Sequence, residues 1–343
     1  MSKHAENGAR APILITMGEP AGIGPEVAAR AWQALDGWIG GRPLRLVGDR
    51  TVFRAFGEIP EEAFWRASKF GSPGTAGVPP ARPQSESNAR PADTNKRPAG
   101  RRRSQGRLAV VAAIDTVVRA ALAGEAAAIV TAPVHKAKLL DAGFPFAGHT
   151  EYLAELTGAP RAVMMLVGSG LRVVPLTIHI PLAEVPAAIS RTAIIETAEI
   201  VLQSLARDFA IPRPRLAIAG LNPHAGESGK LGREDGEIIA PAVDALRARG
   251  RLVQGPLPAD TMFHEAARAQ YDAALCMYHD QALIPLKTLA FWEGVNVTLG
   301  LPIVRTSPDH GTACDIAGKG IADPRSMVAA IRLAAKMADA RKF

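Results

Sequence analysis

Residues 273–287 read AALCMYHDQALIPLK, a stretch that joins an apolar run to polar groups and then to a helical segment. The run Ala273–Tyr278 has the composition of a buried strand, and His279 and Asp280 end it directly, with Lys287 one helical stretch later. In an open α/β sheet, ligands bind beyond the carboxyl ends of strands, where this imidazole and carboxylate would lie. A solvated turn at a strand end is the plainer alternative, and this segment alone favours it.

The same order of strand, polar turn and helix recurs along the chain. The run APILITM is followed by the turn GEPAGIG and by the helical PEVAARAWQAL, in which Pro25 suits a first helical turn. Further strand-like runs, each followed by polar residues and a helix, are LRLVGD, AAAIVTAP, RAVMMLVG, LRVVPLTIHI and RLAIAGLN. Strands joined by crossover helices predict an α/β fold with a mainly parallel sheet and helices on both faces.

Length and composition indicate how many domains the chain has, what class of protein it is and where it is located. A chain of 343 residues exceeds one ordinary core, so two domains are expected. With 48% apolar and 21% charged residues, and no uncharged stretch long enough to cross a bilayer, a soluble protein without membrane contact is expected. The first ten residues lack an apolar signal core, which predicts a cytoplasmic location. Cys276 and Cys314 are expected to be reduced, structural thiols.

The net charge of +7 is concentrated in one segment. Residues 71–107 hold eight basic and two acidic side chains, so the remainder of the chain is close to neutral. That distribution argues against an extended nucleic-acid face. The segment is rich in Pro, Ser, Arg and Gly and nearly lacks large apolar groups, which predicts a disordered insertion within a domain.

Three histidines follow strand-like runs, namely His179, His224 and His279. Their separation is far too wide for a helical zinc motif, but the ends of parallel strands meet along one sheet edge. Three imidazoles at such an edge could bind a divalent ion and leave one position open for a substrate. Each histidine taken singly fits a satisfied, partly buried side chain better, and the pattern leaves both interpretations open.

Several residues have the chemistry of an anion site. Thr150 stands at the head of a predicted helix beside His149, where it would either cap the helix or donate to an anion held by the helix N-terminus. Arg305 provides the planar fork that binds phosphate or carboxylate, and Asn296 lies nearby in the sequence. Together with Lys287, these residues predict a small, strongly anionic ligand.

The turn MGEPAGIGPEV contains Gly22-Ile23-Gly24 between a strand and a helix. The third glycine of a dinucleotide-binding fingerprint is missing, because position 27 is valine. The turn therefore fails as a Rossmann motif, although its backbone can still approach a ligand closely.

Five stretches together carry a resemblance to a known family: ITMGEPAGIGPEV, VTAPVHKAKLLDAGFPFAGHTEYLAE, LNPHAGE, MYHDQALIPLK and GVNVTLGLPIVRTSPDHGTACDIAGKGIADP. They resemble the 4-hydroxythreonine-4-phosphate dehydrogenase family of vitamin B6 biosynthesis over nearly the whole chain except 71–107. The resemblance implies an isocitrate/isopropylmalate dehydrogenase-like fold with two intertwined domains. Residues 1–145 plus 300–343 would form the cofactor-side domain, and residues 146–299 the domain for substrate, metal and dimerisation.

The resemblance also assigns roles to individual residues. One divalent metal per subunit, zinc first with magnesium or cobalt as alternatives, would sit at a homodimer interface that shares the active site, on His179, His224 and His279. The substrate contacts would be His149, Thr150, Lys287, Asn296 and Arg305. The cofactor contacts, by similarity to the wider isopropylmalate dehydrogenase group, would be Ile23, His310, Asp315, Ala322 and Asp323. A carboxylate at Asp315 would repel a 2′-phosphate, so NAD is expected, with NADP possible.

The implied activity is NAD(P)-dependent oxidation of 4-phosphooxy-threonine to a 3-keto acid that decarboxylates to 3-amino-2-oxopropyl phosphate. Lys287 would relay the alcohol proton or only contact the anion, and Asp260 in PADTMF is a second candidate for metal or proton work. A paralogous dehydrogenase for a four-carbon sugar-acid phosphate of the threonate or erythronate type, or for a dihydrodiol, is the main alternative. A three-histidine metallohydrolase would leave unexplained the stretch HGTACDIAGKGIADP, residues 310–324, which resembles a dinucleotide-binding loop. A non-catalytic phosphate-binding protein would leave the histidines unexplained.

Overall fold

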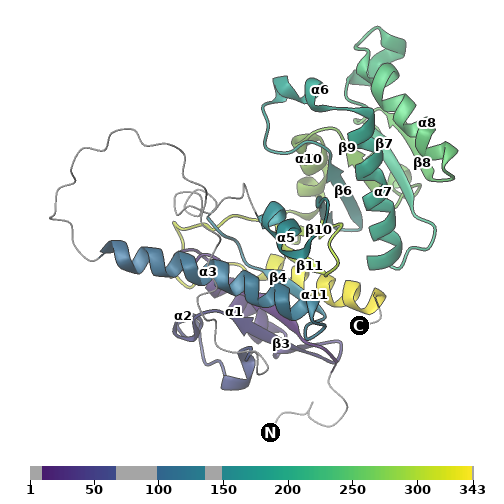
Figure 1. Ribbon diagram of the computed structural model, residues 1–343. Coiled ribbons are helices and arrows are strands. Elements are labelled where there is room, and N and C mark those ends of the chain that lie inside the picture. The colour runs from purple at the N-terminus through teal and green to yellow at the C-terminus, as the bar shows by residue number, and fades with distance from the viewer. Residues whose placement is uncertain (1–9, 67–98, 136–148, 342–343) are drawn as a thin grey trace, which may run out of the picture.

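The computed structural model describes residues 10–66, 99–135 and 149–341, and Figure 1 shows their arrangement. Within these ranges one sheet has eleven strands in the order β2-β3-β1-β4-β11-β10-β5-β6-β9-β7-β8. The strands are β1 Ile13–Thr16, β2 Trp38–Ile39, β3 Arg42–Val47, β4 Ala128–Thr131, β5 Val163–Gly168, β6 Leu171–Pro175, β7 Arg215–Ala219, β8 Leu252–Leu257, β9 Ala273–Cys276, β10 Val295–Leu299 and β11 Arg305–Pro308.

The helices alternate with these strands along the chain. They are α1 Gly24–Ala34, α2 Arg50–Arg54, α3 Ala99–Leu122, α5 His149–Thr157, α6 Val185–Ala188, α7 Arg191–Asp208, α8 Ala240–Ala248, α9 Glu265–Arg268, α10 His279–Ala290 and α11 Arg325–Ala340. Short 3-10 or π turns are η1 Glu61–Ala63, η2 Leu182–Glu184, η3 Pro223–Gly229 and η4 Asp235–Ile239. Across the described ranges, none of the helices combines the length and apolar character needed to cross a membrane.

The sheet consists of two parallel blocks joined by antiparallel strands. In the first block β3, β1, β4 and β11 run parallel, and in the second β6, β9, β7 and β8 do so. Strands β10 and β5 lie between the blocks and pair antiparallel with their neighbours. The α/β fold with a mainly parallel sheet is confirmed. The antiparallel centre was not predicted, and it includes the hairpin β5–β6, whose tight turn uses the positive φ angles of Ser169 and Gly170.

Helices cover both faces of the sheet, as predicted, because successive strand residues alternate between the two faces. Ile13 and Ile15 of β1 share one apolar core with residues of α1, α7, α8 and α11, whereas Leu14 between them joins residues of α3 and α5. On that second face, α10 covers the other block through a third core that contains Cys276. Figure 1 shows the two blocks with their helices side by side.

Helix α3 corrects one sequence prediction. It begins at Ala99, inside the segment 71–107 that was expected to be disordered, while residues 67–98 lie outside the described residues. Arginine and glutamine have helix propensities close to that of leucine, so the run RRRSQGR can extend the helix without any apolar side chain. The division into residues 1–145 plus 300–343 and residues 146–299 stays a prediction. Helix α5, which follows the boundary at 145, packs on α3 of the first block.

Candidate active site

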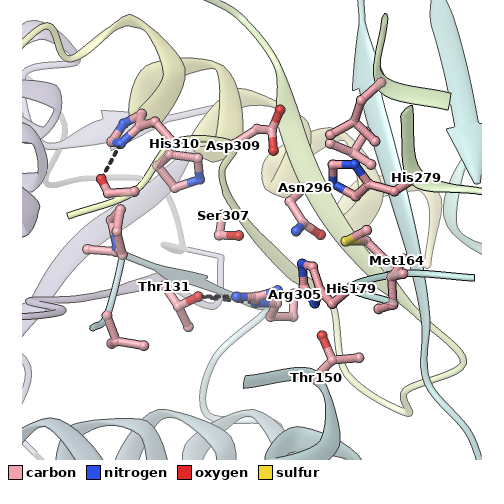
Figure 2. A pocket seen from close by; sticks show the side chains of 18 of the residues that line it. Thr131, Thr150, Met164, His179, His279, Asn296, Arg305, Ser307, Asp309 and His310 are labelled. Carbon is pink, nitrogen blue, oxygen red and sulfur yellow. Dashed lines mark hydrogen bonds between the residues drawn. The ribbon is translucent and has the colours of Figure 1, made fainter. Parts of the chain in front are cut away.

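A cavity of about 320 Å³ opens where the two parallel blocks meet, and Figure 2 shows its side chains. Its lining includes Thr131 at the end of β4, Thr150 on α5, Met164 on β5, His179 after β6, His279 at the start of α10, Asn296 on β10, and Arg305, Ser307, Asp309 and His310 on or just after β11. Residues from distant parts of the chain therefore converge on one concave site.

Arg305 is the buried cation of this cavity. Arg305 is 3% exposed. Its guanidinium donates to Thr131 Oγ1 from Nη2 at 2.6 Å and from Nε at 3.1 Å. It also donates from Nη1 to Thr298 Oγ1 at 2.8 Å. Burial lowers the pKa of Arg305 to about 10, so the group is still protonated at neutral pH. A buried guanidinium that is held in one orientation is suited to bind the oxygens of a planar carboxylate or a tetrahedral phosphate.

Helix α5 adds a second feature suited to an anion. It begins at His149, so Thr150 lies in its first turn, and the interpretation of Thr150 as an N-cap before the helix is wrong. Thr150 lines the cavity, so the N-terminal end of α5 faces the site. Unpaired backbone N–H groups at a helix N-terminus attract anions. The side chain of His149 lies outside the described residues.

Two of the three predicted metal ligands lie together. The ring centroids of His179 and His279 are 5.9 Å apart, and both rings line the cavity. His279 Nδ1 lies 2.7 Å from Asp280 Oδ1, a contact that orients the imidazole and leaves Nε2 to face a ligand. Asp280 was noted in the sequence only as the polar end of a strand, and the structure gives it this orienting contact.

His224 is not part of this group. It lies in η3, in a run from His224 to Ser228 in which every residue has a positive φ, and it is exposed. Among the described residues there is no cluster of three or more His, Cys, Asp or Glu side chains that could hold a metal ion. One chain therefore brings together two of the three predicted ligands.

Lys287 is not part of the cavity lining but binds a residue that is. Its Nζ donates to the carbonyl oxygen of Asp309 at 2.9 Å and lies 2.6 Å from Asp309 Oδ2. Asp309 itself lines the cavity, so Lys287 reaches the site through this carboxylate. Asp260, the other proposed acid–base residue, is exposed on a turn after β8 and is not in the cavity lining.

The segment 309–324 packs on the start of α1, which joins several predicted cofactor residues. The amide of Ile23 donates to Thr312 O at 2.9 Å, and the amide of Ala322 donates to Glu26 Oε1 at 3.0 Å. A Cβ on Gly22 would lie 2.8 Å from Thr312 O, so glycine permits this close approach. The glycine turn thus serves contact with the protein's own loop.

The remaining cofactor candidates differ in their surroundings. His310 lines the cavity, its Nδ1 contacts Gly311 O at 3.0 Å, and its buried Nε2 has no hydrogen-bond partner among the described residues. Asp315 is exposed on the same loop. Asp323 binds Arg325 through Oδ2 at 2.5 Å, and this hydrogen bond is the main cause of its lowered pKa. The buried, unpartnered nitrogen of His310 marks a place where a ligand can accept or donate.

Some cavity residues were missed by the sequence prediction. Thr131, Ser307 and Asp309 line the cavity, and Thr298 binds Arg305 behind it; all four stand in stretches that carried the family resemblance, but only their neighbours were selected. A threonine that satisfies a buried guanidinium has no sequence signal of its own, because the pairing of Thr131 with Arg305 depends on strands far apart in the chain. Adjacent strands β4 and β11 are the feature that would have identified it.

Comparison with known proteins gives a consistent result. A model of the family described as "Pyridoxal phosphate biosynthetic protein PdxA" matches residues 45–334. The 4-hydroxythreonine-4-phosphate dehydrogenase of Caulobacter vibrioides is 50% identical over 337 residues, covering 96% of this chain and 98% of that protein. The enzyme of the same name from Roseobacter denitrificans is 51% identical over 345 residues, with the same two coverages.

Solved structures agree with these relatives. The 4-hydroxythreonine-4-phosphate dehydrogenase from Klebsiella pneumoniae is 35% identical with a TM-score of 0.75, covering 96% of this chain and 99% of that chain. A terephthalate 1,2-cis-dihydrodiol dehydrogenase from Burkholderia xenovorans is 29% identical with a TM-score of 0.62, covering 95% and 98%. Family model, relatives and structures coincide, and the chain belongs to the PdxA family of pyridoxal phosphate biosynthetic proteins.

Proposed function

We propose that this chain oxidises 4-phosphooxy-threonine with a nicotinamide dinucleotide as hydride acceptor, in the biosynthesis of pyridoxal phosphate. Relatives at 50% and 51% identity carry the name of this activity. The observation in the chain itself that carries the proposal is the buried guanidinium of Arg305 in one cavity with His179 and His279. That combination suits a substrate with a phosphate at one end and an alcohol to be oxidised at the other.

Arg305 is proposed to bind the phosphate. Thr131 and Thr298 fix its guanidinium plane, and a planar fork of this kind forms paired hydrogen bonds with phosphate oxygens. The first turn of α5, with Thr150 on the cavity wall, supports the same anion from another side. Asn296 on β10 provides an amide for the polar groups of the substrate, and His149 is proposed as a further contact on the resemblance alone.

A divalent metal is proposed to be held by His179, His279 and His224. Two imidazoles with ring centroids 5.9 Å apart, one of them oriented by Asp280, suit two ligand positions. His224 lies apart from them in a single chain, so the proposal requires a site shared between two copies. When bound, such an ion supplies Lewis-acid chemistry to the substrate alcohol. Zinc is expected first, since imidazole ligands favour it, with magnesium or cobalt as alternatives.

The nicotinamide cofactor is proposed to contact the segment 309–324 and the turn before α1. The buried Nε2 of His310, which has no partner among the described residues, suits a hydrogen bond to such a ligand. Ile23 and Ala322 are both buried where the two segments meet, and Asp323 is half-buried beside them. The carboxylate of Asp315, exposed on this loop, would accept from a ribose hydroxyl and repel a 2′-phosphate, so NAD is expected in preference to NADP.

The reaction balances as a two-electron oxidation followed by loss of CO2. The hydroxyl proton leaves to a base, the C3–H bond breaks with its electron pair passing as hydride to the nicotinamide, and a ketone forms. Because this ketone is beta to the carboxylate, the bond to the carboxylate carbon breaks, and a proton replaces CO2 to give 3-amino-2-oxopropyl phosphate. Lys287, joined to the cavity by Asp309, is favoured over the exposed Asp260 as the group that handles the alcohol proton; it would receive that proton as the neutral amine, after passing one of its own protons to solvent.

A homodimer is proposed because the site is incomplete in one chain. Large apolar side chains near the histidines are exposed: Leu182 is 67% exposed and lines a second cavity with His179 and His279, and Ile284 on α10 is 64% exposed. A second copy covering these side chains would remove apolar surface from water. A cytoplasmic location stays a prediction.

Oxidation of a four-carbon sugar-acid phosphate is the second candidate, because it would use the same phosphate site and metal. The dihydrodiol dehydrogenase named above is a weaker structural match than the Klebsiella enzyme, with a TM-score of 0.62 against 0.75.

The test is reduction of NAD and of NADP by the purified protein with 4-phosphooxy-threonine, threonate phosphate and erythronate phosphate in turn. The highest kcat/KM is expected for 4-phosphooxy-threonine, and a higher value for a sugar-acid phosphate would establish the second candidate.

A further inference from the structure

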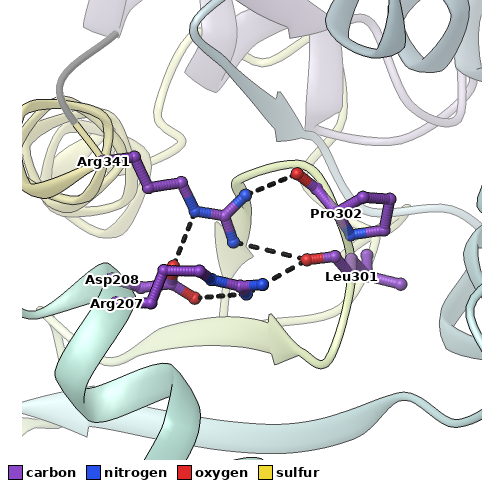
Figure 3. Close-up of polar contacts among 5 residues, drawn as sticks. All are labelled: Arg207, Asp208, Leu301, Pro302 and Arg341. Atoms are coloured by element: carbon purple, nitrogen blue, oxygen red, sulfur yellow. Dashed lines mark hydrogen bonds and ion pairs between the residues drawn. The ribbon is translucent and has the colours of Figure 1, made fainter.

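A buried carboxylate outside the cavity binds two arginines, as Figure 3 shows. Asp208, the last residue of α7, is 1% exposed. Its Oδ1 accepts from Arg341 Nε at 2.6 Å and from Arg207 Nε at 2.6 Å, and its Oδ2 accepts from Arg207 Nη2 at 2.9 Å. A buried carboxylate is stable only when it is paired, and both arginines share this one carboxylate, so the three side chains form one unit.

The same two arginines also hold the connection between β10 and β11. Arg341 donates from Nη1 to Pro302 O at 2.7 Å and from Nη2 to Leu301 O at 3.3 Å, and Arg207 Nη2 donates to Leu301 O at 3.1 Å. Arg341 directly follows α11, whereas Arg207 belongs to α7. Two helices from different parts of the chain thus fix the carbonyl oxygens of one short turn.

The turn is the link between two cavity residues. Asn296 lies on β10 and is paired across the ladder with Ser307 of β11, and Arg305 begins β11 three residues after Pro302. Arg305 also bonds to Thr298 on β10, so the guanidinium depends on how the two strands meet. A shift of the turn would therefore move Arg305 relative to the rest of the cavity, and a misplacement of about 1 Å can cost about a hundredfold in rate.

We propose that Asp208, Arg207 and Arg341 are positioning residues for Arg305. None of their described hydrogen bonds reaches the cavity lining. They act by holding Leu301 and Pro302, which sets the position of the guanidinium proposed to bind the phosphate end of the substrate. The inference rests on the proposed function for its substrate, whereas its geometry is independent of any cofactor or metal.

A purely structural cluster would lower stability without changing the anion site, and two matched variants separate these roles. Arg341→Lys keeps a positive charge beside Asp208 but loses the fork that reaches Leu301 and Pro302. Arg42→Lys is the control: Arg42 is fully buried, it binds Asp339 of the same helix α11 at 2.9 Å, and its described hydrogen bonds do not involve the turn.

Both variants and the unchanged protein are compared in melting temperature, in the Kd for inorganic phosphate by calorimetry, and in the KM for each substrate. Arg341→Lys is expected to raise the phosphate Kd and the KM for the phosphorylated substrate by about tenfold, with the KM for the nicotinamide unchanged. Arg42→Lys is expected to lower the melting temperature and leave both phosphate constants alone. Equal phosphate constants in the two variants would overturn the proposal.

Three further outcomes are separable. If Arg341→Lys does not fold, Arg207→Lys, at a side chain 45% exposed, tests the same contact to Leu301 with less risk to the core. If the unchanged protein binds phosphate but reduces no nicotinamide with any of the three substrates, the proposed function fails while the phosphate Kd still tests the positioning role. If the unchanged protein binds no phosphate, the positioning proposal fails as well.

Discussion

Thr131 Oγ1 accepts two hydrogen bonds from the guanidinium of Arg305, at 2.6 Å from Nη2 and at 3.1 Å from Nε. The two residues lie on adjacent parallel strands, with Thr131 at the end of β4 and Arg305 at the start of β11. Because both are almost fully buried, the hydroxyl replaces the water that would otherwise solvate the cation. The orientation of the buried cation thus depends on a threonine 174 positions away in the chain.

Thr131→Val should weaken both the fold and the anion site. Valine has nearly the shape of threonine but cannot accept, so two buried N–H donors lose their partner, at a cost of about 1–3 kcal/mol in unfolding free energy. The KM for the phosphorylated substrate should rise, since the guanidinium is no longer fixed. Thr131→Ser restores the hydroxyl and should recover most of both losses; a serine variant as impaired as the valine variant would contradict this account. Denaturant unfolding and steady-state kinetics measure the two effects.

Arg305→Ala should mainly affect binding. Loss of a charged contact of about 1.5–3 kcal/mol corresponds to a rise of about tenfold to a hundredfold in KM for the phosphorylated substrate, with kcat largely retained. Steady-state kinetics at saturating nicotinamide measure both constants. A collapse of kcat at unchanged KM would mean that Arg305 acts on the transition state instead.

Asp280→Asn should weaken metal binding without removing a ligand. Asp280 lies 2.7 Å from His279 Nδ1, and changing an outer partner of a ligating histidine typically costs about 10–100-fold in metal affinity. Competition with a fluorescent chelator measures the metal affinity of the purified protein. Asp244→Asn, at a side chain 74% exposed on α8, serves as a carboxylate control. A chelator should also abolish turnover until a divalent ion is restored. Full activity of metal-free protein would refute the metal proposal.

Acid should release the loop that holds the cofactor candidates. The hydrogen bond from Arg325 lowers the pKa of Asp323 from its ordinary value of 3.8, so the folded state prefers the carboxylate. A lowered folded pKa gives stability that is present above about pH 4 and is lost as pH falls through the folded value. The difference in melting temperature between the unchanged protein and Asp323→Asn should therefore shrink below about pH 4. A difference that stays constant down to pH 2 would show that Asp323 has no such role.

Much of the fold could be predicted from the sequence, because it depends on local patterns. The strand beginning at Ala273 lies where the apolar run Ala273–Tyr278 predicted it, although it ends two residues early at Cys276, and a helix begins at the polar end of the run, at His279. The antiparallel centre could not be predicted, since the pairing of β10 with β5 and β11 is set by the register of distant strands. Composition was misleading at the start of α3, where arginines continue a helix without apolar side chains.

The sequence predicted which residues belong to the site better than it predicted which side chains contact one another. Thr150, Asn296 and Arg305 line one cavity with two of the histidines, but the partner of Lys287 is Asp309, which carried no separate signal. Contacts of this kind follow from tertiary packing rather than from spacing. His224 marks the same limit: it lies apart from the other two histidines in one chain, and the proposal that a second copy brings it to them is not one that the sequence of a single chain can test.

The central claim is that the chain oxidises 4-phosphooxy-threonine to a keto acid that loses CO2, and the carbon balance of the reaction tests it most directly. With 4-phosphooxy-threonine carrying ¹³C in its carboxylate, NADH formation is followed by absorbance while labelled CO2 and phosphorylated products are followed by NMR. Oxidation at C3 followed by decarboxylation predicts one labelled CO2 and one 3-amino-2-oxopropyl phosphate for each NADH formed. NADH formation with the label retained in a stable acid, or no NADH from this substrate with the metal-replete protein, would contradict the proposed function.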